Sequence, residues 1–123
     1  FVLGDVQIEA GPNGSEWAVI QVTAIEGDDL KSARRILIPA TASAENTDMK
    51  WRDAEKTSVG RDWGKAPSLV EGVAARVTFA RLEGLKAWAL DERGNRREEI
   101  AVQNGAAELG PQHRTLWYEV SAK

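Results

Sequence analysis

The chain has 123 residues, a length typical of one domain rather than two. Its composition, 42% hydrophobic and 28% charged, indicates a globular fold and excludes an intrinsically disordered chain. The net charge is −3, with basic residues scattered among acidic ones, which argues against nucleic-acid and membrane partners; the absence of cysteine excludes disulfide and thiol chemistry.

Apolar and polar residues alternate along the first part of the chain, which is the pattern of β-strands. Three strands are predicted there: one ending at Ala10 before a Gly-Pro-Asn-Gly turn, a long one over 17–25, and one over 35–42. Pro39 places the third strand at a sheet edge or beside a bulge, because proline has no backbone N–H to donate. Residues 30–35 could form a helical turn.

Residues 43–70 interrupt this alternation with a long polar segment that contains glycine and proline. A connection of this length without secondary structure of its own is unusual in a compact domain and often carries function. The segment is therefore predicted to be a long loop, and it is the first place to look for a binding site.

Strands resume after the polar segment. They are predicted at 72–82, at 85–90 and 99–103 on either side of a hairpin turn, and at 106–109 and 115–121. About seven or eight short strands, with no amphipathic helix to connect parallel ones, predict an all-β antiparallel β-sandwich of immunoglobulin-like or jelly-roll-like type.

The titratable residues do not form the pattern of an enzyme. His113 is the only histidine, and it lacks the neighbouring nucleophile that a catalytic triad needs. The paired carboxylates lie in turns or at strand ends, where adjacent side chains point to opposite faces, so we predict no catalytic residue, cofactor or metal. Four turn residues could supply oxygen ligands to a structural calcium: Asp28, Asp29, Asp91 and Asn95. A solvated turn is the simpler explanation for each.

Tryptophan is the unusual feature of the composition, with five in 123 residues. Trp17, Trp88 and Trp117 fall within predicted strands, where an indole can pack in a sandwich core. Trp17 and Trp117 alternate with the apolar faces of their strands, which places both rings outside or under a covering loop. Trp51 and Trp63 differ because both lie in the long polar segment.

A flat indole among carboxylate, amide and guanidinium groups is suited to sugar recognition. The C–H face of a pyranose stacks on the ring, and its hydroxyls bond to the polar groups. The candidate ligand-binding residues are therefore Trp51, Trp63, Arg61, Asp62, Lys65, Asp48, Asn46 and Trp117. The alternative is that the two loop tryptophans only anchor the loop to the sandwich.

Three runs of sequence carry a resemblance to a known type of domain: NTDMKW at 46–51, SVGRDWGKAPSLVEGVAARVTF at 58–79, and LKAWALDERGNR at 85–96. Over most of its length the chain resembles the C-terminal non-catalytic β-sandwich domain that follows the catalytic barrel in bacterial glycoside hydrolases. WGKAPSLVEG is the most specific block. The resemblance supplies no binding residues, and the same block is equally suited to a structural role in which Trp63 plugs the sandwich edge.

The resemblance implies a single domain, residues 1–123, excised from a larger secreted enzyme, in keeping with a first residue that is Phe1 rather than Met. We therefore expect an extracellular or periplasmic carbohydrate-binding module that binds plant-type polysaccharides or oligosaccharides through its loop tryptophans. Its other expected partner is the catalytic domain of the same polypeptide. The alternative is a purely structural β-sandwich that packs on and stabilises a neighbouring glycoside hydrolase barrel.

Overall fold

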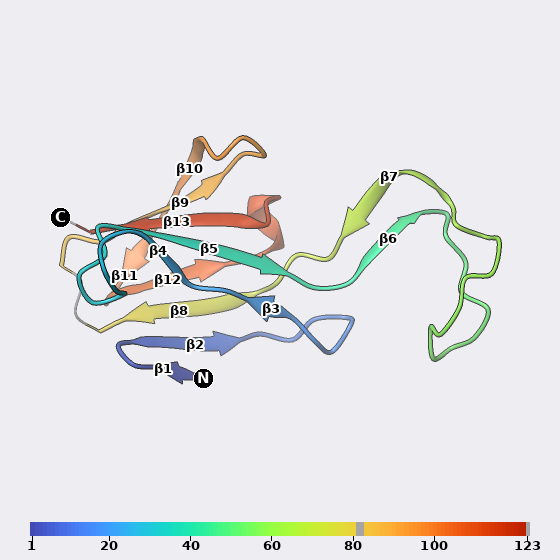
Figure 1. Cartoon of the computed structure of the whole chain (residues 1–123), viewed down its shortest axis with the longest axis horizontal. Helices are drawn as coiled ribbons and strands as arrows, with labels where there is room; N and C mark the ends of the chain where they lie inside the picture. Colours follow the sequence, from blue (N-terminus) through green and yellow to red (C-terminus); the bar gives the residue numbers. More distant parts are fainter. Residues whose placement is uncertain (81–82, 123) are drawn as a thin grey trace.

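The computed structural model describes residues 1–80 and 83–122. Within these residues the strands form two antiparallel sheets that pack face to face, and a separate two-stranded hairpin (Figure 1). The chain is all-β, and the predicted β-sandwich is confirmed. One short 3-10 helix, η1 (Pro111–His113), precedes the last strand. Among the residues described, no helix is long and apolar enough to cross a membrane.

The first sheet has five strands in the order β1-β2-β8-β12-β11, each antiparallel to its neighbours. Their bounds are β1 (Val2–Leu3), β2 (Val6–Ala10), β8 (Ala75–Phe79), β12 (Ala106–Leu109) and β11 (Val102–Gln103). β8 is the central strand, and the two edges of the sheet are the very short strands β1 and β11.

The second sheet has six strands in the order β10-β9-β13-β5-β3, with β4 also paired to β5. Their bounds are β10 (Arg96–Ile100), β9 (Lys86–Leu90), β13 (Trp117–Ser121), β5 (Arg35–Thr41), β3 (Val19–Ile20) and β4 (Thr23–Glu26). β9 and β10 form the predicted hairpin around residues 91–95, but the strand predicted over 99–103 is divided between the sheets, since β10 ends at Ile100 and Val102 begins β11 of the first sheet. The short strands β3 and β4 leave one edge of this sheet irregular.

The predicted alternation of inward and outward side chains holds in the central strands. In β5, Ile36, Ile38 and Ala40 are buried, and the residues between them are half-buried. In β8, Val77 and Phe79 are buried in the same way. These side chains meet between the sheets in one apolar core, because each strand turns every second residue inward and removes it from water.

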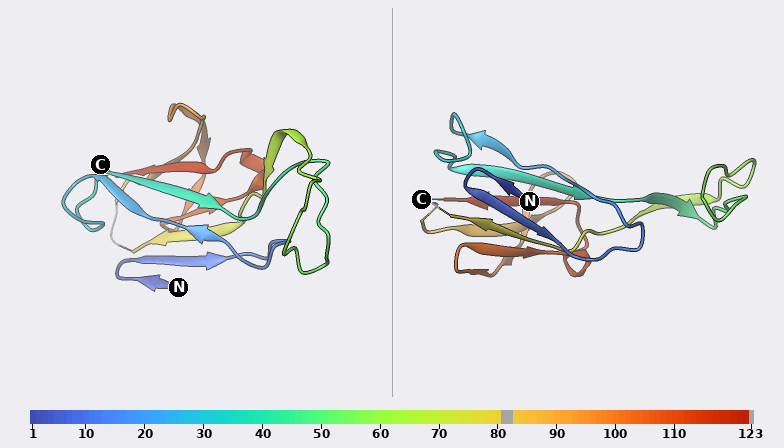
Figure 2. Two further views of the ribbon diagram at one scale, coloured as in Figure 1. Left: turned by 45° about the vertical axis from the view of Figure 1, so that its right-hand side comes forward. Right: turned by 90° about the horizontal axis from the view of Figure 1, so that it is seen from below.

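Residues 43–70 are not the unstructured loop that the sequence predicted. β6 (Ala44–Thr47) and β7 (Lys65–Val70) pair antiparallel, and residues 48–64 connect them at the far end. β6 follows β5 of the second sheet and β7 leads into β8 of the first, so the hairpin leaves from between the two sheets. It projects from one end of the sandwich in every view (Figure 1 and Figure 2). We call residues 43–71 the arm.

Three other predicted elements have different bounds. Residues 17–25 form β3 and part of β4 rather than one strand. The hydrogen-bond ladder breaks at Gln21, because its amide donates to the Pro39 carbonyl oxygen but Pro39 has no N–H to donate a second bond back to Gln21. Residues 30–35 form a turn and the start of β5 instead of a helical turn. The strand predicted over 72–82 is limited to β8, and its residues 81 and 82 lie outside the described residues.

Candidate functional site

A carboxylate clamps the base of the arm to the sandwich. Glu71 follows β7, and its Oε1 accepts a hydrogen bond from the Gly14 amide while its Oε2 accepts one from the Ser43 hydroxyl at 3.3 Å. The Glu71 amide donates to the Ser43 carbonyl oxygen at 2.9 Å, which extends the β6–β7 ladder to the base. Hydrogen bonds from Ser15 and then Gly14 outweigh partial burial and lower the pKa of Glu71. The clamp is therefore charged at neutral pH.

The tip of the arm is ordered by hydrogen bonds among its own residues. The Lys50 amide donates to the Asp62 carbonyl oxygen at 3.0 Å, which joins the two sides of the tip. The Asp53 carboxylate accepts from the Thr57 hydroxyl at 2.5 Å and from its amide at 2.7 Å. These two bonds lower the pKa of Asp53 and close a local turn. The tip is thus a folded loop whose geometry does not depend on the sandwich.

Trp51 packs into the arm. Its ring is half-buried, and its Nε1 donates to Glu45 Oε1 at 2.9 Å. Lys56 Nζ lies 2.6 Å from the same oxygen and 5.8 Å from the centroid of the indole ring. The bonds from Lys56 and Trp51 lower the pKa of Glu45. Trp51 therefore joins the tip to β6 within the arm, and not to the sandwich as the anchoring alternative expected.

Trp63 is the exposed indole of the arm, with 62% of its surface open to solvent. Its carbonyl oxygen accepts from Asn46 Nδ2 at 2.9 Å, so the backbone is held in place while the ring remains open. The next residue, Gly64, has φ of +71°, and a Cβ there would lie 2.3 Å from the Thr47 carbonyl oxygen. Glycine is required at this position, because the clash is with backbone that cannot turn aside.

An open hollow of about 280 Å³ lies beside Trp63. It is lined by side chains of both arm strands and of the tip: Ala44, Glu45, Asn46, Met49, Trp51, Val59, Trp63 and Ser68. Val59 is buried although it lies in the tip, which shows that the tip has a small apolar interior of its own. The lining therefore combines an open aromatic ring with amide, hydroxyl and carboxylate groups.

All of the predicted ligand-binding residues except Trp117 lie on the arm. Those on the arm are Asn46, Asp48, Trp51, Arg61, Asp62, Trp63 and Lys65. Trp117 begins β13 on the sandwich itself and is 43% exposed. Of the predicted residues, only Asn46, Trp51 and Trp63 line the hollow beside Trp63, and the assignment of all eight to a ligand stays a prediction.

The polar residues of the arm divide into two groups. Asn46 and Asp48 hold the arm together: Asn46 Oδ1 accepts from the Ser68 hydroxyl at 2.6 Å, and Asp48 pairs with Lys65 at 2.7 Å. The side chains of Arg61 and Asp62 are exposed, and within residues 1–80 and 83–122 they make no hydrogen bond or ion pair. These two side chains are available to an external ligand.

An apolar patch lies on the outer face of the second sheet, and it includes Trp117, one of the three tryptophans that the structural alternative predicts to form such a patch. Val19 pairs with Thr41, and Trp117 pairs with Pro39, so the register places Val19, Pro39 and Trp117 on one face. Val19 is 54% exposed, and Trp17, two residues earlier, is 52% exposed. Alternation alone places Trp117 outside, but the strand pairing that completes the patch is long-range and has no local signal.

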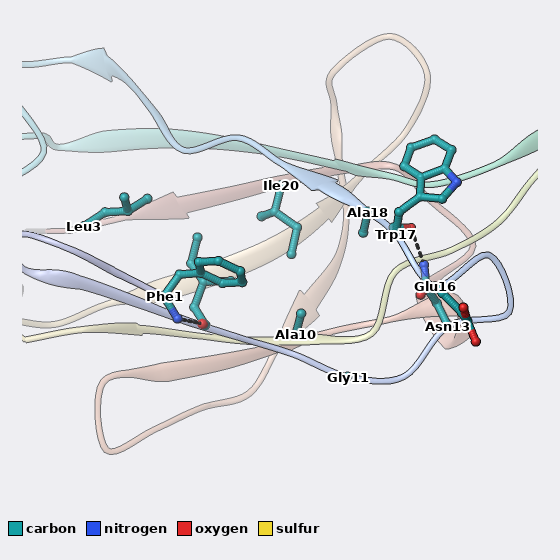
Figure 3. Close-up of a pocket in the computed structure, with 10 residues that line it drawn as sticks. Phe1, Leu3, Ala10, Gly11, Asn13, Glu16, Trp17, Ala18 and Ile20 are labelled. Atoms are coloured by element: carbon teal, nitrogen blue, oxygen red, sulfur yellow. Dashed lines mark hydrogen bonds between the residues drawn. The ribbon is translucent and has the colours of Figure 1, made fainter.

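A second hollow, of about 510 Å³, lies at the open edge of the sandwich between β1–β2 of the first sheet and β3 of the second (Figure 3). It contains none of the predicted site residues. Its apolar lining comes from both sheets: Phe1, Leu3, Ile8, Ala10, Trp17, Ala18 and Ile20. We call this hollow the edge groove.

The four residues suggested for calcium do not share a site. Asp29 precedes β5 at the end of the sandwich far from the arm, whereas Asp91 follows β9 at the end that bears the arm. Each binds within its own turn, Asp29 accepting from the Ser32 amide and Asp91 from the Asn95 amide, both at 2.8 Å. In the described part of the chain, no group of three histidine, cysteine, aspartate or glutamate residues is placed to hold a metal ion.

His113 is a buried structural residue. Its Nδ1 lies 3.0 Å from Glu98 Oε1, and its Nε2 lies 3.3 Å from the Glu108 carbonyl oxygen. Its ring packs edge-on against Tyr118, with 6.1 Å between the ring centroids. The imidazole therefore links η1 to β10 and β12, and both of its nitrogens are occupied in doing so.

Comparisons of the chain with protein-family models, with curated proteins and with solved structures find no match. The family resemblance drawn from the sequence therefore stays a prediction. The function has to be argued from the arm and from the surfaces of the sandwich.

Proposed function

We propose that this chain is a non-catalytic carbohydrate-binding accessory module whose arm carries the glycan contact. The observation that supports this most directly is Trp63, an indole 62% exposed beside a hollow that also presents amide and carboxylate groups. An exposed indole offers a large flat apolar face together with a polar N–H, which suits it to a contact surface. Trp51 has a supporting role, because its Nε1 is bonded to Glu45 inside the arm.

Stacking on Trp63 suits a neutral sugar ring. A pyranose can lay its C–H face on the indole, and its hydroxyls can exchange hydrogen bonds with the exposed side chains of Arg61 and Asp62, which precede Trp63 in the chain. The arm projects beyond the end of the sandwich, so an extended polysaccharide can pass over its tip without meeting the sheets (Figure 1). In the secreted enzyme that the sequence resemblance implies, this contact would hold a catalytic domain near its substrate by raising the effective concentration.

Replacing Trp63 by alanine tests the proposal. We expect Trp63→Ala to weaken glycan binding by about 1–3 kcal/mol, roughly 5- to 150-fold, which is the range for stacking on an aromatic side chain. The melting temperature should stay nearly unchanged, because the ring is mostly exposed. Affinity electrophoresis in gels containing β-glucan, xylan, mannan or pectin measures the binding.

Trp17→Ala is the matched control, because Trp17 is an indole of similar exposure, 52%, that lies on the sandwich. It should migrate like the parent protein in every gel. If the parent protein is not retarded by any of the polysaccharides, glycan binding is ruled out for these classes. If Trp17→Ala loses retardation and Trp63→Ala does not, the contact lies on the sandwich and the assignment to the arm is wrong.

A second candidate function is structural, in which the sandwich packs on a neighbouring catalytic domain and has no ligand of its own. The apolar patch of Val19, Pro39 and Trp117 supports this candidate, since contiguous exposed apolar surface is typical of protein contacts. Tryptophan is also a frequent energetic centre of such contacts.

The structural candidate predicts that the isolated chain associates with itself or binds the catalytic domain supplied separately. Trp117→Gln should weaken either association by removing the largest side chain of the patch, and gel filtration over a range of concentrations measures both. A parent chain that stays monomeric and does not bind the catalytic domain contradicts this candidate.

A further inference from the structure

The edge groove lies where each sheet of the sandwich ends in an edge strand. β1 is an edge of the first sheet and β3 an edge of the second, and the hollow of about 510 Å³ lies between them. Figure 3 shows the side chains of Phe1 and Ile20 directed toward each other across this space. Ile8, a core residue only 4% exposed, also lines it. The groove is therefore an apolar surface over the covered core, at an edge where no strand among the described residues joins the two sheets.

The backbone of β3 offers hydrogen-bonding groups to this edge. The Gln21 amide donates to the Pro39 carbonyl oxygen at 3.0 Å, whereas the Ala40 amide donates at 2.9 Å to the Leu116 carbonyl oxygen on the other side of β5. In an antiparallel ladder, the residues between two hydrogen-bonded pairs turn their N–H and C=O outward. Ile20 pairs with Ala40, so its N–H and C=O point away from β5 and toward the open edge.

β1 has the same arrangement on the other side of the groove. Phe1 and Ile8 exchange both of their backbone hydrogen bonds at 2.8 Å, so the next pair, Val2 with Gln7, is not hydrogen-bonded. Val2 therefore turns its N–H and C=O away from β2.

The two edge strands, β1 and β3, also run in the same direction. β2 and β5 run toward the arm, since β5 leads into β6 and β2 ends beside the start of β8. β1 and β3 are antiparallel to them and run away from the arm. A strand that lies between β1 and β3 can therefore be antiparallel to both.

The side chains that line the groove define the chemistry of an occupant. The lining is apolar except at the end near the arm, where Asn13 donates to the Trp17 carbonyl oxygen at 2.5 Å and Glu16 is exposed. Within the described residues the Glu16 carboxylate has no hydrogen-bonding or ion-pair partner. An occupant that complements this lining is apolar along its length and positively charged at the end beside Glu16.

We propose that the edge groove accepts an extended β-strand of another polypeptide, antiparallel to β3, with apolar side chains at every second position and a lysine or arginine at its C-terminal end. The strand hydrogen-bonds to the N–H and C=O of Ile20, and its apolar side chains cover the exposed side chains of Phe1 and Leu3. Because an antiparallel strand runs toward the arm, its C-terminal end lies beside Glu16. This site shares no residue with the hollow beside Trp63.

Hydrogen exchange in the presence of a synthetic peptide tests the proposal. The probe is a short peptide in which valine and threonine alternate and lysine is the last residue. The control peptide has the same composition in an order that breaks the alternation. At saturation we expect the alternating peptide to slow exchange of the Ile20 amide by about tenfold or more. The Gln21 amide, already bonded to Pro39, should not change. No protection of Ile20, or equal protection by both peptides, would overturn the proposal.

A charge reversal tests the orientation of the strand. Glu16→Lys should weaken binding of the lysine-ended peptide by about fivefold and improve binding of the same peptide ending in glutamate. Glu92→Lys, an exposed change in the 91–95 hairpin, is the control and should have no effect. Equal binding by all three proteins would overturn the antiparallel placement. Protection of Ile20 that appears at high protein concentration without peptide would assign the groove to a second copy of this chain instead.

Discussion

At the scale of single residues, the most constrained polar group is the Glu119 carboxylate on β13. Glu119 is 2% exposed, although its alternation with the buried Tyr118 and Val120 places it on the outer face of the sheet. Arg35 donates to its Oε2 at 2.6 Å, and Arg96 donates to its Oε1 through two nitrogens. The Arg96 guanidinium also lies 3.7 Å from the centroid of the Trp88 ring. These contacts form a closed ion-pair cluster that occupies the middle of the face.

The cluster makes stability depend on acid pH. Burial acts to raise the pKa of Glu119, but the hydrogen bonds and charges of Arg35 and Arg96 outweigh it, so the folded-state pKa lies below the ordinary value of 4.5. At a pH above that ordinary value of 4.5, the ionised carboxylate makes its full contribution to stability. This contribution is lost as the pH falls through the folded-state pKa. We expect the free energy of unfolding, measured with urea between about pH 7 and pH 3, to decrease on acidification.

Glu119→Gln is the control for this prediction, because it removes the titrating group and keeps the size of the side chain. The variant should be less stable than the parent protein at neutral pH and should lose less stability on acidification. Part of the pH dependence should remain in both proteins, since other carboxylates also have a lowered pKa: Asp29, Glu45, Asp53, Glu71 and Asp91. Identical slopes in the two proteins would contradict the role given to Glu119.

At the scale of elements, the arm is a two-stranded hairpin without a neighbouring strand. Such hairpins are only marginally stable in water, so the arm needs local devices to stay ordered. All six residues of β7 are exposed, including Leu69 at 58% and Val70 at 40%. Burial therefore contributes little to β7. Its order comes from the Glu71 clamp, from the hydrogen bonds of the tip and from backbone geometry at Gly64.

Gly64→Ala is expected to open the arm and leave the sandwich folded. Gly64 has φ of +71°, and the added Cβ would lie 2.3 Å from the Thr47 carbonyl oxygen. A strained left-handed residue costs about 1–3 kcal/mol, and the arm should lose at least this much stability. Hydrogen exchange should accelerate in β6 and β7 and stay unchanged in β5 and β13.

Gly94→Ala is the matched control. Gly94 also has a positive φ, +82°, but nothing lies within 4 Å of a Cβ added there. Gly94→Ala should therefore cost only the strain of the positive φ, and hydrogen exchange should change only in the β9–β10 hairpin. If Gly64→Ala leaves exchange in the arm unchanged, the close approach of the backbone at Gly64 is not what orders the arm.

At the scale of the whole molecule, the arm and the sandwich belong to one continuous chain, but their side chains do not pack in a common core. The apolar core draws on strands of both sheets, and Ala42 and Val73 are its members nearest the arm. Among the described residues, no side chain from 44–70 belongs to that core. The sandwich therefore has a complete core of its own, and the arm is an addition at one end.

A chain without the arm should fold. The Ser43 carbonyl oxygen and the Glu71 amide are 2.9 Å apart, so a short glycine linker can join these two residues in place of 44–70. We expect the melting temperature to change by less than about 5 °C, equivalent to about 1 kcal/mol, and retention on the glycan gels to disappear. Calorimetry and affinity electrophoresis measure the two effects. A shortened chain that does not fold would show that the core depends on the arm, and one that folds and still binds glycan would place the site on the sandwich.

The elements that the sequence predicted well are those whose pattern is complete within a few residues. In β5 the alternation of Ile36, Ile38 and Ala40 with half-buried neighbours identifies both the strand and its inward face. The sequence predicted from Pro39 that its strand lies at a sheet edge or beside a bulge, but β5 is an interior strand between β13 and β3. The interruption that Pro39 does cause, in the neighbouring strand at Gln21, depends on which segment pairs with β5. An exposed patch at Trp117 could be expected from the sequence, but its neighbours Val19 and Pro39 could not, because strand register is set by the whole fold.

Composition and two-residue periodicity by themselves determined that the protein is all-β and which faces form the core, since burial of every second side chain is a local property of a strand. Only the tertiary structure decided that residues 43–70 form a projecting arm, because neither β6 nor β7 alternates apolar and polar residues and the two are separated by the whole of 48–64. It also decided between the two loop tryptophans, which occupy similar surroundings in the sequence. β6 brings Glu45 to the Nε1 of Trp51 and holds that ring, whereas Trp63 lies where nothing covers it and remains 62% exposed.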